Sequence, residues 1–179
     1  MKRRTDLVEK IETFHCVTFI LGDDLFGIEI GLIKEIMEYD GITPVPMMPI
    51  FVRGIINLRG AVIPVIDLSV RFGRGLTGVR PSTCIAILSL PAMQGGYSEI
   101  GIMLDAVCAV LEIPLSDIGP APTLGVKIRD DFIQGVATIE GKFAILLNVQ
   151  SVLSVSELNA WTESVAQQHW TNDGEATQC

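Results

Sequence analysis

The chain contains an internal repeat, and this repeat limits the possible folds more strongly than any other feature of the sequence. Residues 51–68, FVRGIINLRGAVIPVIDL, align with residues 132–149, FIQGVATIEGKFAILLNV, at an offset of 81. Upstream, residues 26–38 align with residues 100–112 at an offset of 74. The matched pairs include Gly27 with Gly101, Phe51 with Phe132, Gly54 with Gly135, Gly60 with Gly141, and Asp67 with Asn148. Because both blocks match in the same order, we expect two copies of one unit, about 14–78 and 82–150.

Both copies have the pattern of short β-strands. The candidate strands are rich in Ile and Val and are bounded by Gly, Asp or Pro. They are residues 16–21, 26–30, 55–58, 61–66, 84–90, 99–104 and 143–147. Many short strands without long helices predict small barrels, and one copy alone would have a thin core. The sequence therefore predicts a mainly β fold in which the two copies pack together.

Glycine and proline positions indicate how these strands are connected. Arg59-Gly60 and Glu140-Gly141 are expected to form tight turns, in which the glycine adopts a positive φ. Pro64 lies inside a candidate strand and removes one backbone donor from it. That strand is therefore expected to lie at a sheet edge or to be bulged at Pro64.

Short helices are expected after the last strand of each copy. Asp67 and Asn148 are suitable N-caps for the segments LSVRF and VQSVL, and Gly73 is a plausible end for the first helix. Residues 156–179 are expected to form a C-terminal helix followed by a frayed tail. The segment 156–168 carries apolar residues at helical spacing, namely Leu158, Trp161 and Val165.

The net charge of −8 is unevenly distributed along the chain. Residues 1–80 hold ten basic and ten acidic residues, whereas residues 81–179 hold three basic and eleven acidic residues. This balance disfavours nucleic acid as a partner, because phosphate neutralisation needs a basic face. Residues 53–80 contain five arginines and a single acid, Asp67. These arginines are expected either to bind a protein partner with an acidic patch or to form ion pairs with acids of the second half. These arginines are Arg53, Arg59, Arg71, Arg74 and Arg80.

Membrane insertion and disulfide or metal frameworks have little support. The longest uncharged stretch, residues 81–98, holds two prolines and two glycines, and no apolar h-region follows the charged N-terminus. The cysteines are widely spaced without a C-x-x-C motif, so we expect them to be reduced and buried in a cytoplasmic protein. They are Cys16, Cys84, Cys108 and Cys179.

Catalytic motifs are similarly poorly represented. The chain has two histidines, His15 and His169, and no P-loop motif. Residues 73–78, GRGLTG, match G-x-G-x-x-G, but they follow a predicted short helix and precede a strand. A dinucleotide site needs the opposite order, so this segment is interpreted as a flexible linker between the copies. An enzyme therefore remains the weakest of the hypotheses.

Residues 51–73, FVRGIINLRGAVIPVIDLSVRFG, resemble the CheW family of chemotaxis coupling proteins. The family signature is an apolar-x-G-x-x-N-L-R-G turn, an apolar strand with Pro, then D-L and a short helix ending near F-G. The resemblance extends to GDDLFGIEIGLIKEIME upstream and to the blocks of the second copy. It covers about residues 14–155, which it implies form a single CheW-like domain.

The resemblance implies a fold of two pseudo-symmetric, five-stranded SH3-like β-barrels around a shared core. It also implies a non-catalytic adaptor. Together with the charge, motif and hydropathy arguments above, we expect a cytoplasmic protein without a metal or cofactor, which neither binds nucleic acid nor inserts directly into a membrane. Such an adaptor bridges the signalling tip of methyl-accepting chemoreceptors and the regulatory domain of a CheA-type histidine kinase. The expected binding mode at the receptor is a helical hairpin in the cleft between the barrels.

Seven residues are carried over from the family pattern as candidate partner contacts. Four belong to the signature turn, and Arg59 among them would present its guanidinium to a partner. Three belong to an apolar-x-acid-apolar segment, whose two isoleucines could equally be core residues. The seven are Gly54, Asn57, Arg59, Gly60, Ile33, Glu35 and Ile36. A rival hypothesis of a different class is a β-barrel domain that binds a small ligand between its two halves.

Overall fold

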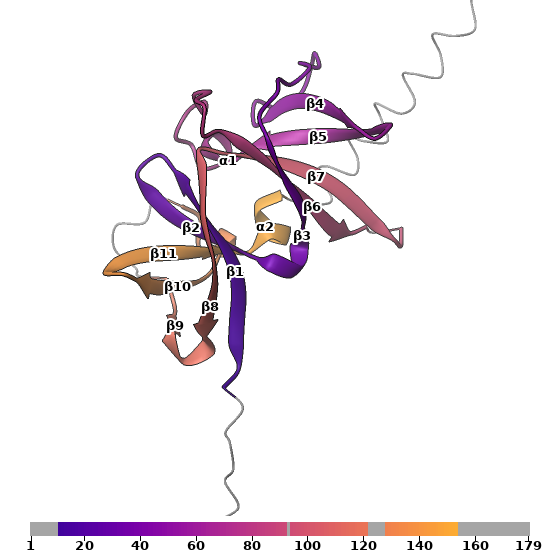
Figure 1. Ribbon diagram of the computed structural model, residues 1–179. Coiled ribbons are helices and arrows are strands. Elements are labelled where there is room, and N and C mark those ends of the chain that lie inside the picture. The colour runs from indigo at the N-terminus through magenta and orange to yellow at the C-terminus, as the bar shows by residue number, and fades with distance from the viewer. Residues whose placement is uncertain (1–10, 93, 122–127, 154–179) are drawn as a thin grey trace, which may run out of the picture.

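The computed structural model describes residues 11–92, 94–121 and 128–153, and within them the chain is mainly β (Figure 1). The predicted C-terminal helix and tail lie outside these residues. The strands are β1 Thr13–Leu21, β2 Asp24–Glu29, β3 Ile33–Glu38, β4 Val52–Leu58, β5 Ala61–Asp67, β6 Cys84–Pro91, β7 Tyr97–Leu104, β8 Ala106–Pro114, β9 Ile118–Gly119, β10 Ile133–Ile139 and β11 Lys142–Leu147. The helices are α1 Leu68–Arg71 and α2 Val149–Leu153, with 3-10 turns η1 Ile30–Leu32, η2 Leu115–Asp117 and η3 Asp130–Phe132.

The strands form two sheets, and each sheet takes strands from both copies of the repeat. One sheet has the order β8-β1-β2-β11-β10-β9, and the other has the order β3-β6-β7-β5-β4. The β1–β2 hairpin of the first copy therefore completes the sheet of the second, and the β6–β7 hairpin completes the sheet of the first (Figure 1). The sheets consequently do not coincide with the sequence halves 14–78 and 82–150. The copies instead exchange their first hairpins, because β2 and β7 pair in parallel with β11 and β5.

The strand register confirms the repeat in atomic detail. Val65 of β5 lies opposite Gly101 of β7, and Leu146 of β11 lies opposite Gly27 of β2. These two pairs are related by the sequence offsets of 81 and 74. The register of β4 with β5 shifts between Val52 and Gly54, and that of β10 with β11 shifts at the equivalent place, between Ile133 and Gly135. The two halves are therefore pseudo-symmetric down to their β-bulges.

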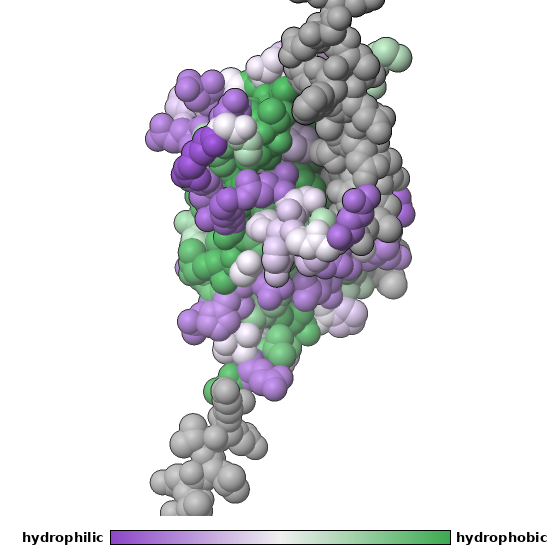
Figure 2. Space-filling view, turned by 90° about the vertical axis from the view of Figure 1, so that its right-hand side faces the viewer, coloured by the Kyte–Doolittle hydropathy of each residue, from purple (hydrophilic) through white to green (hydrophobic). Residues whose placement is uncertain are grey.

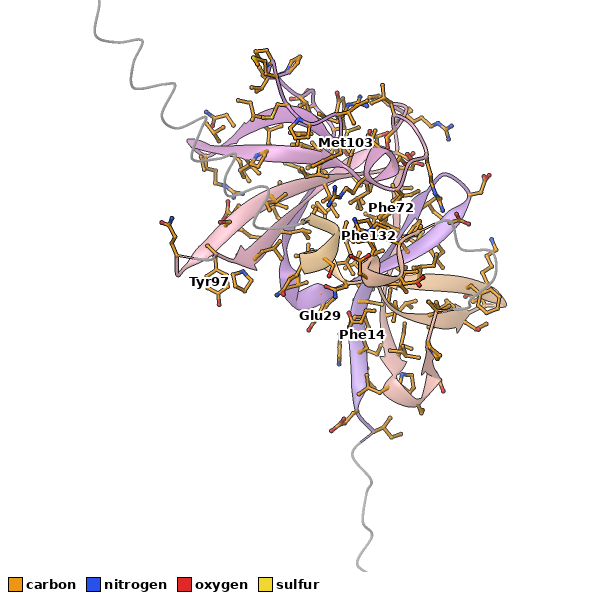
Figure 3. All side chains as sticks on the ribbon, turned by 180° about the vertical axis from the view of Figure 1, so that it is seen from behind. Phe14, Glu29, Phe72, Tyr97, Met103 and Phe132 are labelled. Atoms are coloured by element: carbon orange, nitrogen blue, oxygen red, sulfur yellow. The ribbon has the colours of Figure 1, made fainter. Side chains whose placement is uncertain are left out.

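Three apolar clusters hold the sheets together. Each sheet curls around a small cluster of its own, and a larger core lies between the sheets. In Figure 3, Phe14 marks one small cluster, Met103 marks the other, and Phe72 and Phe132 lie in the central core. The Phe72 and Phe132 ring centroids are 6.1 Å apart, so the central core joins the two copies through aromatic packing. The prediction of two pseudo-symmetric barrels around a shared core is confirmed in this form, although one sheet has six strands rather than five.

The predicted turns occur in both copies with the same geometry. Arg59 and Gly60 have φ values of 52° and 86°, and Glu140 and Gly141 have values of 50° and 78°. Positive φ at both central residues is the type I′ conformation, whose twist suits a two-residue hairpin. The glycine positions predicted from the repeat are confirmed.

Asp67 caps α1 as predicted, and it also binds Thr77 and Arg53, which the sequence did not indicate. Its carboxylate accepts the backbone N–H groups of Ser69 and Val70, and it is fully buried. It also accepts hydrogen bonds from the backbone N–H and hydroxyl of Thr77, at 2.8 and 2.7 Å, and forms an ion pair with Arg53. The linker 73–78 is therefore fixed to the first copy at Thr77, which corrects the interpretation of a flexible linker.

Two further predictions need correction. Strand β5, which contains Pro64, lies inside its sheet between β4 and β7, but the ladder with β7 begins only at Val65. Pro64 therefore does not have to donate to β7 and no edge position is needed, and the bulge of this hairpin lies in β4, between Val52 and Gly54, rather than at Pro64. Among the cysteines of the described residues, Cys16 and Cys84 are buried as expected, whereas Cys108 on β8 is exposed.

Candidate functional site

Arg59 and Glu35, both predicted as partner contacts, bind each other. The two terminal nitrogens of Arg59 donate to the two carboxylate oxygens of Glu35, at 2.8 and 3.0 Å. Arg59 lies in the turn between β4 and β5, and Glu35 lies in β3 (Figure 1). Strands β3 and β4 are the two edge strands of their sheet. This bidentate ion pair therefore connects the two edges of the curled sheet.

The other signature residues shape the turn that carries Arg59. The Asn57 side-chain oxygen accepts the backbone N–H of Gly60 at 3.0 Å, which fixes the turn. Gly54 is buried with a φ of 145°, and a Cβ at this position would collide with the carbonyl oxygen of Thr43. Asn57 and Gly60 therefore lie at the surface beside Arg59, whereas Gly54 supports them from inside the sheet.

The segment of β3 that contains Glu35 presents one apolar side chain. Ile33 is half-buried and packs against the central core, which agrees with the alternative that Ile33 is a core residue. Ile36 is 40% exposed, and its pairing with Ala86 places it on the face of β3 that is opposite to Glu35, which pairs with Ile87. The structure therefore brings Glu35, Asn57, Arg59 and Gly60 together at the surface, whereas Ile36 is exposed on the opposite face of β3.

The ion pair changes the acidity of both partners. The hydrogen bond from Arg59 lowers the pKa of Glu35, and the positive charges of Arg59 and Lys34 lower it further. The same hydrogen bond, together with the charge of Glu35, raises the pKa of Arg59. Both groups are consequently ionised at neutral pH, and the turn carries a permanent positive charge.

The equivalent site of the second copy has a different chemistry. Glu140 stands in the place of Arg59 and Ala109 in the place of Glu35, and Glu140 forms no ion pair with the described residues. Strand β8 instead exposes four consecutive small or apolar side chains at the edge of its sheet. They are Val107, Cys108, Ala109 and Val110.

Sequence reasoning missed this exposed strand, although a signal was present. The repeat aligns Lys34 and Glu35 with Cys108 and Ala109. These two positions are therefore charged in the first copy and uncharged in the second. Phe143 is also largely exposed in the second half. On the face shown in Figure 2, apolar surface occurs as separate patches between hydrophilic residues.

The other arginines of the basic stretch mostly serve the fold. Arg53 pairs with Asp67, and Arg74 pairs with Asp24 at 2.6 Å, so these acids belong to the first half rather than the second. The Arg71 guanidinium lies over the Phe51 ring and donates to the backbone carbonyl of Val152 in the second half. The side chain of Arg59 is more exposed than that of Arg53 or Arg74, the other two arginines that pair with these acids of the first half.

A small-ligand site between the halves is not favoured. The central core contains an apolar void of about 10 Å³, whereas pockets for small molecules measure roughly 300–1,000 Å³. Residues of both copies line it, including Ile28, Ile102 and Val152. Across the described residues, no three His, Cys, Asp or Glu side chains gather as a metal site would require. None of the helices described is long and apolar enough to span a bilayer.

Comparisons with known proteins agree with this geometry. Residues 15–157 match the model of the CheW-like domain. The chain is 32% identical over 151 residues to the chemotaxis protein CheW of Klebsiella aerogenes, covering 84% of this chain and 87% of that protein. It is 33% identical over 144 residues to the chemotaxis protein CheW of Rhizobium meliloti, covering 80% and 90%.

A solved structure shows the same architecture. The crystal structure of the scaffolding protein TtCheW from Thermoanaerobacter tengcongensis aligns with a TM-score of 0.69 and 33% sequence identity. The alignment covers 79% of this chain and 88% of that one. With the duplicated sheets, the signature turn and the domain match in agreement, the chain belongs to the CheW-like family of chemotaxis proteins.

Proposed function

We propose that this chain is a non-catalytic scaffold that couples the cytoplasmic tips of chemoreceptors to the regulatory domain of a CheA-type histidine kinase. The observation that carries the proposal is the signature turn, in which Asn57 holds Arg59 at the surface and Glu35 fixes its guanidinium. Family membership supplies the partner class, and the exposed turn supplies a rigid contact. The proposed place of action is the cytoplasm, where the partners recruit the scaffold to membrane receptor arrays.

A scaffold that connects two partners needs two separate surfaces, and the pseudo-symmetric fold provides candidates. The first is the charged surface formed by Glu35, Asn57, Arg59 and Gly60, with Ile36 exposed on the opposite face of β3. The second is the edge strand β8 of the other sheet, which is apolar over four consecutive residues. An exposed apolar edge strand is suited to association with another chain. The two surfaces differ in charge and polarity, so they suit different contacts.

The test is a binding assay with purified components. The full chain is mixed separately with a receptor signalling tip and with the regulatory domain of the kinase, and then with both together. The proposal expects binding to each partner and a ternary complex in which receptor state changes kinase activity. Binding to neither partner, or mutually exclusive binding of the two, would overturn it.

A further inference from the structure

A second ion pair lies next to the Arg59–Glu35 pair and involves none of the other predicted contact residues. Lys34, which precedes Glu35 in β3, donates from its ammonium to the carboxylate of Glu99 in β7. Strand β6 lies between β3 and β7 in the sheet, so this contact spans the intervening strand. Two adjacent residues of an outer strand therefore take part in two ion pairs that reach opposite parts of the same sheet.

The two ion pairs form one group, which we call the charge cluster: Lys34, Glu35, Arg59 and Glu99. Each pair acts on the other, since the charge of Lys34 lowers the pKa of Glu35 and the charge of Glu99 raises the pKa of Arg59. The four charges alternate in sign and sum to zero. A cluster of this kind holds its side chains more firmly than an isolated surface pair does, because each charge has more than one opposite neighbour.

The cations of the charge cluster face outward and the acids are more enclosed. In the first pair, the Arg59 side chain is 70% exposed and the Glu35 side chain 26%. In the second pair, the Lys34 side chain is 46% exposed and the Glu99 side chain 27%. The cluster is neutral in sum, but the parts of it that an approaching protein meets are positive. This positive surface occurs on a chain whose net charge is −8.

From this arrangement we propose that the charge cluster is a docking surface for an acidic segment of a partner protein, with Lys34 and Arg59 as the contacting cations. Glu35 and Glu99 are positioning residues that hold the two cations in place. The inference rests on the proposed scaffold function, and it adds Lys34 and Glu99 to the site together with the charge of the partner segment.

The second copy indicates that this recognition is confined to one end of the molecule. The positions equivalent to Lys34, Glu35 and Arg59 hold Cys108, Ala109 and Glu140, which include no cation. An acidic segment that docks on the first copy would meet Glu140 on the second and be repelled. The charge cluster therefore sets the orientation of the scaffold as well as the identity of the partner segment.

The test measures binding of the full chain to the receptor tip and to the kinase regulatory domain, each by calorimetry at low and high salt. Lys34→Gln is expected to weaken binding to one of the two partners by about fivefold and to make that binding less dependent on salt. Lys34→Arg is expected to retain wild-type affinity. Glu99→Gln leaves the cation present but unfixed, so it is expected to weaken binding less than Lys34→Gln while keeping the salt dependence.

The matched control is Lys142→Gln, which removes the same charge from an exposed residue of the second half and is expected to leave binding unchanged. Thermal unfolding of each variant checks that the fold is retained. If the wild type binds neither partner, the proposed function fails and this inference fails with it. If the wild type binds but Lys34→Gln matches it in affinity and salt dependence, or if Lys142→Gln weakens binding equally, only this inference fails. Self-association that Lys34→Gln abolishes, with both partners bound normally, would identify a second copy as the occupant and overturn the proposal.

Discussion

Arg59 and Glu35 lie 24 residues apart in the sequence and form a bidentate ion pair between the β4–β5 turn and β3, the outer strand at the other edge of the sheet. The pair serves the fold, because it joins the ends of a curled sheet. It also serves the surface, because the more exposed partner is the cation. Experiments on this pair must therefore separate the closure of the sheet from contact with a partner.

Exchanging the two charges separates these roles. Arg59→Glu alone places two carboxylates together and is expected to lower the thermal unfolding midpoint and to weaken partner binding by at least about tenfold. The double variant Arg59→Glu with Glu35→Arg re-forms an ion pair of opposite direction, so the unfolding midpoint is expected to recover while binding stays weak. Thermal unfolding and calorimetry measure the two effects. Recovery of binding in the double variant would show that the pair acts only through the fold.

The lowered pKa of Glu35 predicts how the contribution of the pair depends on pH. The stabilisation is fully present above the ordinary glutamate pKa of 4.5 and is lost as the pH falls through the lower pKa of the folded state. Glu35→Gln should therefore be less stable than the wild type at neutral pH, and the difference should vanish in acid. Unfolding midpoints measured from pH 7 down to the acid range test this. A difference that stayed constant across that range would contradict the prediction.

Gly54 is expected to tolerate no side chain. Gly54→Ala combines a φ of 145° with a collision between the new Cβ and the carbonyl oxygen of Thr43, so it should lose about 2 kcal/mol or more of unfolding free energy. Gly31→Ala is the matched control, because a Cβ there meets nothing within 4 Å. Chemical denaturation gives both values, and equal values would refute the steric argument.

Asp67 and Asn148 offer a comparison at equivalent positions. Asp67→Asn removes the charge that pairs with Arg53 in a fully buried site, and it is expected to cost about 3–5 kcal/mol. Asn148 is an exposed cap whose side-chain oxygen accepts the N–H of Ser151 at 3.3 Å. Asn148→Asp should therefore stay within about 0.5 kcal/mol of the wild type. Denaturation curves for the two variants should differ sharply, and similar losses would mean that the buried network around Asp67 contributes little.

The exposed strand β8 is expected to act in binding rather than in stability. Val110→Lys places a charge on the apolar edge strand. It should weaken the binding of one partner by about tenfold, with little change in the unfolding midpoint. Val62→Lys is a control at an exposed apolar position of the other sheet. Calorimetry with each partner compares the affinities of the two variants. Wild-type affinity of Val110→Lys for both partners would show that β8 is not a binding surface.

The repeat allowed much of the fold to be predicted from the sequence. Offsets of 81 and 74 identified positions that the structure shows in the same register, such as Gly27 opposite Leu146 and Gly101 opposite Val65. The type I′ turns and the helix caps were also predictable, because Arg59-Gly60 and Asp67 have strong local preferences. Local preference does not extend to long-range pairing, and for that reason the exchange of hairpins between the sheets was missed.

Strands β3, β8 and β9 were not identified from the sequence, and the expected turn at Glu140-Gly141 implied β10 without giving its bounds. Lys34, Glu35 and Glu38 in β3 are charged residues that strand propensity disfavours. The pairing with β6, together with the ion pairs of Lys34 and Glu35, overrides that preference. For the candidate site, the family signature located Arg59 and Glu35. Their mutual ion pair was not predicted, because contacts across a curled sheet depend on its closure rather than on sequence spacing.

The exchange of hairpins has a consequence for how the molecule assembles during synthesis. A nascent chain that has emerged only as far as α1 holds β3 and β5 without the hairpin that must lie between them, and its β1–β2 hairpin lacks both neighbours. Neither repeat can therefore reach its final pairing before the other is made. The ribosome must deliver the chain through β7, which ends at Leu104, before the five-stranded sheet can form, and through β11, which ends at Leu147, before the six-stranded sheet can bring β2 and β11 together.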